Sequence, residues 1–207
     1  MKIKSFKSDC LSLSYDVIVQ KYLIDGTSFF FEEKLGENEF DFKKDIANSL
    51  GVHIRDIVIV GSGKLGFSIK PDKEVPNLFP FKKFDQAYEE NGEINKSDLD
   101  IAIVSNTLFD KQLIRLFEHT SHYRSKELWR RDSDRNSLAK YILKGWLKPD
   151  FIPKDYKISD GIEEIQQKYR ILFGREINIG IYKNWYFFEN YHINNIRNIH
   201  LNLISND

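Results

Sequence analysis

The fold is decided by two apolar stretches of sequence, IVIVGSGKLG at residues 57–66 and SDLDIAIV at residues 97–104. In the first, four β-branched residues run directly into glycines, which is typical of a buried strand followed by a turn. The second begins with acids and continues as an apolar run of strand length. Because side chains at positions i and i+2 of a strand share a face, Asp98 and Asp100 should point together while Leu99 and Ile101 enter the core. The two stretches predict adjacent strands of one sheet.

Hydrophobic periodicity predicts further elements outward from these strands. Helical spacing of apolar residues favours helices at 10–23, 40–50, 108–118, 124–147 and 191–203. Alternation predicts a strand at 176–182, and the aromatic run at 185–188 predicts another. We expect a single α+β domain, 1–207, in which helices pack on a small mixed β-sheet.

The predicted domain has three parts. Residues 1–56 form a helical N-terminal part, 57–104 the motif-bearing core, and 105–207 further helices and strands. Within the core, residues 71–96 contain prolines at a density that forbids a continuous helix, so they should form a long insertion loop.

Composition narrows the possible environments and partners. Thirty-one basic and thirty-one acidic side chains cancel, so no net field draws the whole molecule to nucleic acid or to an anionic membrane. Cys10 is the single cysteine, which excludes an intrachain disulfide and fits a reducing compartment. No long apolar run is present to serve as a signal peptide or membrane span. We expect a cytoplasmic protein without a membrane partner.

The segment Gly61-Ser62-Gly63-Lys64-Leu65-Gly66 is the candidate phosphate-binding loop. Backbone N–H groups of glycines that follow a strand can converge on an anion. A dinucleotide-binding fold requires a helix of normal length after the glycines, and prolines interrupt this region. The ATPase phosphate loop requires Ser or Thr after the lysine, where Leu65 stands. A simple tight turn is the remaining alternative.

The second candidate feature is the acid pair Asp98 and Asp100. Adjacent carboxylates repel unless a cation or a proton lies between them, and Mg²⁺ or Mn²⁺ prefers such oxygen ligands together with phosphate. The structural alternative is that Ser97 and Asp98 only begin a strand. Both aspartates are therefore candidate metal ligands.

The order Val60-Gly61-Ser62 followed by Ser97-Asp98-Leu99-Asp100-Ile101 resembles the signature of the DNA polymerase β-like nucleotidyltransferase superfamily, over about residues 57–104. The resemblance implies that Gly61 and Ser62 bind the triphosphate of a nucleotide, with Gly63, Lys64 and Ser68 as further candidates. It implies that Asp98 and Asp100 hold two magnesium ions. The implied reaction moves a nucleoside monophosphate from a nucleoside triphosphate to a hydroxyl of a protein, an RNA end or a small molecule. Bacterial toxin and phage-defence systems are typical settings of this family.

Two departures from that signature shape the expectations. Ser62 and Asp98 are 98 − 62 = 36 positions apart, so the insertion at 71–96 must loop out and is a candidate lid or acceptor-binding element. The third carboxylate of the family should lie on the strand at 176–182, where Glu176 or Asn178 faces the site. Glu176 is the favoured candidate for this catalytic role. An asparagine there instead favours a catalytically idle module that only binds nucleotides or partners.

Overall fold

Four strands form one mixed sheet in the computed structural model, which describes residues 2–35, 38–92, 95–156, 158 and 160–205. They are β1 (Ile57–Val60), β2 (Leu99–Val104), β3 (Trp146–Leu147) and β4 (Ile177–Tyr182), in the spatial order β1-β2-β4-β3. The β1 and β3 strands run antiparallel to their neighbours, and β2 and β4 run parallel to each other. The predicted strands at 57–60, 99–104 and 176–182 are confirmed, as is the α+β character with a small mixed sheet.

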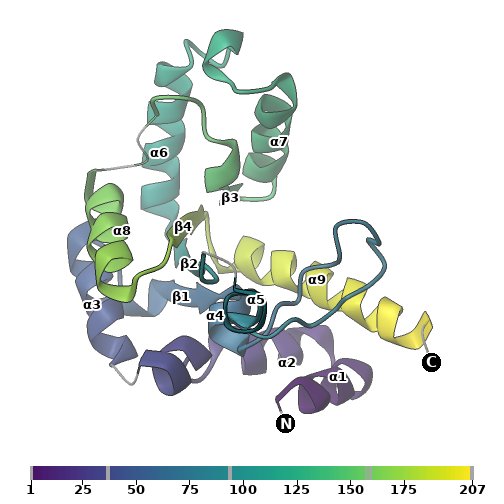
Figure 1. Cartoon of the computed structure of the whole chain (residues 1–207). Coiled ribbons are helices and arrows are strands. Elements are labelled where there is room, and N and C mark those ends of the chain that lie inside the picture. Colours follow the sequence, from purple (N-terminus) through teal and green to yellow (C-terminus); the bar gives the residue numbers. More distant parts are fainter. Residues whose placement is uncertain (1, 36–37, 93–94, 157, 159, 206–207) are drawn as a thin grey trace.

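One face of the sheet is sealed by α3 (Glu39–Leu50), α6 (Asn106–His119) and α8 (Asp160–Phe173) (Figure 1). Alternate residues of each strand point to this face, so the apolar positions of three strands enter one core. Their buried side chains are Ile57, Ile59, Leu99, Ile101, Ile103, Ile177, Ile179 and Ile181.

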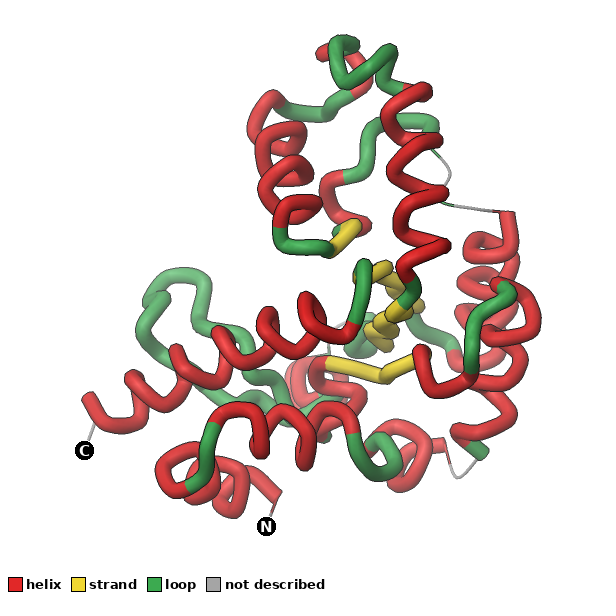
Figure 2. The backbone as a smooth tube through the Cα atoms, turned by 180° about the vertical axis from the view of Figure 1, so that it is seen from behind, coloured by secondary structure: helices red, strands yellow, loops and turns green. Residues whose placement is uncertain are grey.

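The opposite face is covered by α9 (Trp185–Ser205), which continues well beyond the sheet (Figure 2). Its first half packs on the strands through Phe188. Its second half packs on α1 (Lys2–Ser12) and α2 (Tyr15–Val19) through Ile196 and its neighbours. None of the described helices is long and apolar enough to cross a membrane.

The helix predictions near the N-terminus have mixed outcomes. A single helix at 10–23 is wrong, because the chain is extended at Ser14 and restarts as α2 and then as a π-helical segment, η1 (Gln20–Ile24). The helix at 40–50 is confirmed as α3. The Asn38 side chain accepts a hydrogen bond from the Phe40 N–H at 2.9 Å, and Gly51 ends the helix at φ +63°. These are the N-cap and glycine stop that helix ends require.

Three expectations in the second half of the chain need correction. The helix at 124–147 is confined to α7 (Asp132–Leu143), because Trp129 is buried in the core before α7 begins. The aromatic run at 185–188 is the first turn of α9 and not a strand, since the Asn184 carboxamide oxygen accepts a hydrogen bond from the Phe187 N–H. Helix α8 was not predicted, although Ile162, Ile165, Tyr169 and Phe173 repeat at helical spacing and are buried.

Candidate functional site

The Gly-Ser turn lies directly against the acid pair. Val60, the last residue of β1, pairs with Asp100 in the antiparallel ladder, and the short helix α4 (Gly61–Leu65) begins at the next residue. Gly61 has φ +67°, and a Cβ atom at this position would lie 3.0 Å from Oδ2 of Asp100. Both the positive φ and the close approach require glycine. The predicted neighbourhood of turn and carboxylates is therefore present.

Three polar side chains from two parallel strands meet at this point. Asp98 lies just before β2 and Asp100 within it, and Asn178 of β4 stands opposite Asp100 in the ladder. The Asn178 Nδ2 donates to Oδ2 of Asp98 at 3.2 Å and to Oδ1 of Asp100 at 3.1 Å. Among the described residues, no Lys, Arg or His side chain forms an ion pair with either aspartate. A neutral amide thus bridges two carboxylates whose charge no described cation neutralises.

The prediction that Glu176 faces the site is wrong in its geometry. Its side chain is 57% exposed and pairs with Arg170 of α8 at 3.1 Å. Its backbone oxygen accepts a hydrogen bond from the Leu99 N–H at 2.9 Å, which aligns β4 with β2. Glu176 precedes the first strand residue, so its long side chain is free to turn toward the helix. Asn178 occupies the place next to the two aspartates.

Two residues of the predicted phosphate loop point away from the acid pair. A Cβ atom at Gly63 would lie 2.7 Å from Cδ1 of Leu99, so this glycine allows α4 to pack closely on β2. Lys64 is buried, and its Nζ donates to the backbone oxygens of Asp25 and Gly26 at 2.8 and 2.6 Å. Burial lowers the pKa of Lys64 to about 8. The prediction of the Lys64 side chain as a phosphate ligand is wrong, because its ammonium group is committed to these two carbonyl oxygens, whereas the Gly63 backbone N–H stays a predicted phosphate donor.

The predicted insertion is anchored at its base and contains one helix. Ser68 lines the same cleft as Gly61 and Ser62, and its N–H donates to the Lys82 oxygen at 2.7 Å. The expectation of a continuous loop at 71–96 is corrected by α5 (Gln86–Asn91), while residues 93–94 lie outside the described part. The insertion therefore leaves and rejoins the core at fixed points.

A buried ion pair, which was not predicted from the sequence, fastens the end of the insertion to the start of β2. The Arg175 guanidinium contacts Asp85 at 3.1 Å, with both side chains only 5–6% exposed. It also donates to the backbone oxygen of Ser97 at 2.7 Å, and the Ser97 N–H donates to Asp85 at 2.8 Å. Burial raises the pKa of Asp85, but the hydrogen bonds from Arg175 and Ser97 outweigh it and hold this pKa below its ordinary value. The network fixes the residue that precedes Asp98.

A cleft of about 950 Å³ extends from the acid pair between the insertion and α9. Its lining includes Gly61, Ser62, Asp98, Asp100 and Asn178. The turn and the acids, which were predicted from separate stretches of sequence, therefore open into one space.

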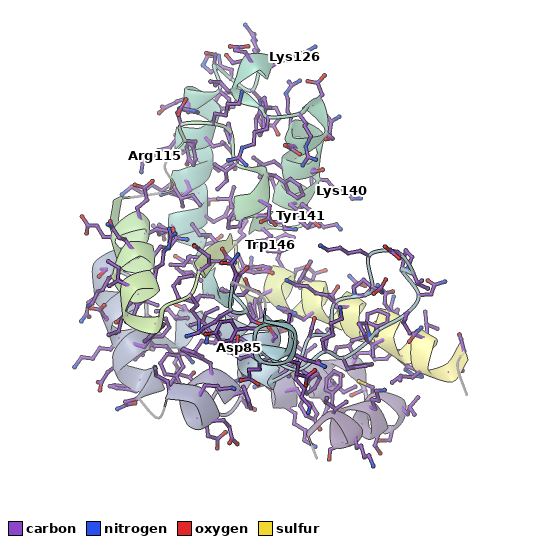
Figure 3. The ribbon with its side chains drawn as sticks, in the orientation of Figure 1. Asp85, Arg115, Lys126, Lys140, Tyr141 and Trp146 are labelled. Carbon is purple, nitrogen blue, oxygen red and sulfur yellow. The ribbon has the colours of Figure 1, made fainter. Side chains whose placement is uncertain are left out.

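Aromatic rings form part of the lining of this cleft. Trp146 stacks on Tyr182 with ring centroids 5.1 Å apart and planes at 8°. Gly180 makes room for this stack, because a Cβ atom there would lie 2.7 Å from the indole Nε1. Tyr141 and Trp146 lie where α7 meets the sheet (Figure 3). The sequence signal for this surface was only the small residue within β4.

The donor set fits a divalent cation of the magnesium type. Mg²⁺ is commonly held by one or two carboxylates, completed by substrate phosphates and water. Asp98 and Asp100 supply two carboxylates, and Asn178 presents an amide oxygen to the same point if its carboxamide turns over. Within the described residues, no group of three or more His, Cys, Asp and Glu side chains is placed to hold a metal. These two carboxylates and the neighbouring amide are thus the residues that fit.

Comparison with known proteins adds no relative. No protein-family profile, curated protein or solved structure matches this chain.

Proposed function

We propose that this protein is a nucleotidyltransferase that moves a nucleoside monophosphate from a nucleoside triphosphate to a hydroxyl acceptor. One observation carries the proposal. The turn at Gly61 and Ser62 lies against Asp100, and both open into a cleft that also contains Asp98. An anion-binding turn beside a carboxylate pair is the arrangement that a metal–triphosphate complex needs.

Each residue has a defined role in this proposal. The first N–H groups of α4 have no intrahelical partner, so Gly61 and Ser62 can donate to phosphate oxygens. Asp98 and Asp100 hold the divalent cation, which when bound supplies charge stabilisation for the reacting phosphate. Asn178 orients both carboxylates through the hydrogen bonds already described.

The proposed reaction is an in-line displacement. The acceptor oxygen forms a bond to the α-phosphorus, the bond from that phosphorus to the bridging oxygen breaks, and pyrophosphate leaves with the electron pair. The neutral amide of Asn178 cannot accept the hydroxyl proton, which therefore passes to water. Asp98 is exposed, so water reaches this end of the cleft.

The neutral side chain beside the two aspartates also favours a second candidate function, since Asp150, the other acid of the cleft lining, is paired with Lys148. In it, the cleft binds a nucleoside triphosphate with its metal and no transfer follows, so the protein is a nucleotide sensor or a partner-recognition module. The observation behind this alternative is Asn178, which stands next to Asp98 and Asp100 and cannot act as a base.

A labelling experiment decides between the two candidates. The protein is incubated with Mg²⁺, a cell lysate and each of the four nucleoside triphosphates labelled at the α-phosphorus. Label on a macromolecule or small acceptor that disappears in Asp98→Asn and Asp100→Asn supports the transferase. Glu176→Gln is the matched control, because it makes the same chemical change just before β4, at a residue that does not line the cleft. Triphosphate binding without label transfer supports the sensor, and absence of both rejects the two.

The proposed setting is the cytoplasm, as expected from the single cysteine. Cys10 is buried in the contact between α1 and its neighbours, and burial raises its pKa to about 12. Its thiol is thereby protected from oxidation.

A further inference from the structure

A row of polar side chains runs along α9 on the side that faces the cleft. Its members recur at alternating spacings of four and three residues, which places them on one stripe of a helix. All five line the cleft, and they are Tyr191, Asn195, Asn198, Asn202 and Ser205. At a rise of 1.5 Å per residue, the fourteen steps from first to last span about 21 Å. The row is therefore much longer than a nucleotide base.

The row begins near the acid pair. The Tyr191 ring contacts the Trp146 indole, with ring centroids 4.8 Å apart. The indole lies over Gly180 of β4, which is two residues from Asn178 on the same face of the strand. An occupant of the row has one end at the proposed reaction centre.

The charges of the cleft argue against a polynucleotide as that occupant. The charged residues of its lining are Lys70 and Lys148 against Asp98, Asp100 and Asp150. Lys148 is already paired with Asp150 at 3.0 Å. Nucleic-acid sites gain their affinity mainly from lysines and arginines that neutralise phosphates. A cleft with more acids than bases and a neutral wall suits a neutral or basic chain instead.

A buried histidine beside the row lacks a hydrogen-bond partner. His192 is 6% exposed, lines the cleft, and neither of its ring nitrogens has a partner among the described residues. Burial lowers its pKa to about 4, so the ring is neutral near pH 7 and offers one donor and one acceptor. Buried polar groups normally find partners. The rings of Tyr182, Phe188 and Tyr191 surround this imidazole, so it forms part of the buried floor beneath the row.

We propose that the row of polar side chains on α9 binds an extended polypeptide segment. A serine, threonine or tyrosine hydroxyl of this segment is the acceptor of the nucleotide. The proposal rests on the transferase function proposed above. Carboxamides donate and accept at once, as the peptide backbone does. At about 3.3 Å per residue, the row accommodates about six residues in extended form. The hydroxyl oxygen bonds to the α-phosphorus, pyrophosphate leaves with the electron pair of the broken bond, and the proton passes to water.

The first test identifies the chemical class of the labelled acceptor. Lysate labelled by the wild-type protein is divided and treated with proteinase K or with ribonuclease A. Label converted to small fragments by the protease and resistant to the nuclease is the expected result. Label released only by the nuclease, or resistant to both, would overturn the polypeptide assignment while leaving the transferase intact.

The second test does not depend on turnover. The full chain is applied to an array of twelve-residue peptides that contain Ser, Thr or Tyr, and binding is compared between wild type and two variants. Asn198→Leu and Asn202→Leu should weaken peptide binding at least tenfold. Asn194→Leu is the matched control, because Asn194 is exposed on the same helix and does not line the cleft. Absence of wild-type binding, or an equal loss in the control, would overturn the proposal.

A third measurement separates this proposal from the one on which it rests. Binding of inorganic tripolyphosphate with Mg²⁺ reports only on the turn and the acid pair. It should be unchanged in Asn198→Leu and Asn202→Leu and lost in Asp100→Asn. If tripolyphosphate does not bind the wild type, the transferase function fails, and the peptide array still decides whether α9 carries a polypeptide site.

Discussion

Two carboxylate sites lie on either side of Ser97, and the protein treats them in opposite ways. Asp85 is buried, ion-paired with Arg175 and hydrogen-bonded to Ser97. Asp98 and Asp100 open into a cleft, and Asn178 is the described side chain that bridges them. A buried charge without a partner costs several kcal/mol. The buried carboxylate of Asp85 is therefore compensated by the guanidinium of Arg175. Asp98 and Asp100 have no such cation among the described residues, so their carboxylate oxygens are available to a ligand.

The largest effect is expected when a negative charge is removed from the acid pair, Asp98 and Asp100. Asp100→Asn should lower nucleotide transfer at least about 10³-fold, equivalent to about 4 kcal/mol, because the cation loses a carboxylate ligand. Its melting temperature in EDTA should equal or exceed that of the wild type, since the repulsion from Asp98 is relieved. Initial rates and thermal unfolding check the two parts. Wild-type activity in this variant would show that the open pair is not the reaction centre.

The next largest effect is expected when the buried ion pair between Arg175 and Asp85 is broken. Arg175→Leu leaves Asp85 buried without its cation and should cost about 3–5 kcal/mol of unfolding free energy. For a chain of this size, that lowers the melting temperature by about 6–20 °C. Arg170→Leu is the control, because its pair with Glu176 is exposed and worth at most about 1 kcal/mol. Equal melting temperatures for the two variants would contradict the contrast between closed and open acids.

The buried imidazole of His192, which has no hydrogen-bond partner among the described residues, should make the stability of the protein depend on pH. The folded pKa of His192, about 4, lies below its ordinary value of 6.5. The unfolded chain therefore takes up a proton first, and stability present above pH 6.5 is lost as the pH falls toward 4. Between pH 6.5 and pH 5 the loss is about 2 kcal/mol. His192→Phe should lack this loss in urea unfolding at the two pH values, and an unchanged slope would reject the assignment.

A smaller effect is expected when a third acid is introduced beside Asp98 and Asp100. Asn178→Asp should tighten Mg²⁺ binding about tenfold, equivalent to about 1.4 kcal/mol, because a third carboxylate joins the donor set. In EDTA the same variant should be less stable than wild type, since three carboxylates then repel one another. Calorimetric titration with Mg²⁺ and thermal unfolding in EDTA measure both. Weaker Mg²⁺ binding would mean that Asn178 itself is an indispensable ligand.

The smallest effect is expected at the acid that sequence reasoning favoured. Glu176→Gln should change the transfer rate by less than about twofold, because its side chain pairs with Arg170 and does not line the cleft. Steady-state rates at saturating triphosphate provide the measurement. A loss comparable with that of Asp100→Asn would restore Glu176 as the third catalytic acid.

The elements that the sequence predicted well are those whose pattern is local. Strand positions follow from β-branched runs at 57–60 and 99–104, and the shared face of Asp98 and Asp100 follows from the two-residue period of a strand. The end of α3 follows from Gly51, the glycine after the last apolar residue of its helical pattern. Predictions failed where a distant contact decided the outcome. Lys64 was taken for a phosphate ligand because two carbonyl oxygens 38–39 residues away are not visible in its own segment.

The local sequence pattern was also unable to decide whether Glu176 or Asn178 lies next to the acid pair. The period of two correctly placed Asn178 on the side opposite the isoleucines, next to the two aspartates. It could not place the end of a long side chain beside Arg170 of another helix. The row on α9 was readable as a spacing in the sequence, but what it faces depends on the path of the insertion.

By itself, the sequence determined strands β1, β2 and β4, the glycine that permits a turn at residue 61, and the acid pair, because each depends on the geometry of a few consecutive residues. Only the tertiary structure decided which groups meet. Register between β1, β2 and β4 brought Gly61, Asp100 and Asn178 together, and packing buried Asp85 with Arg175 across 90 positions of chain. These pairings arise from the burial of a shared core, and no segment contains that information alone.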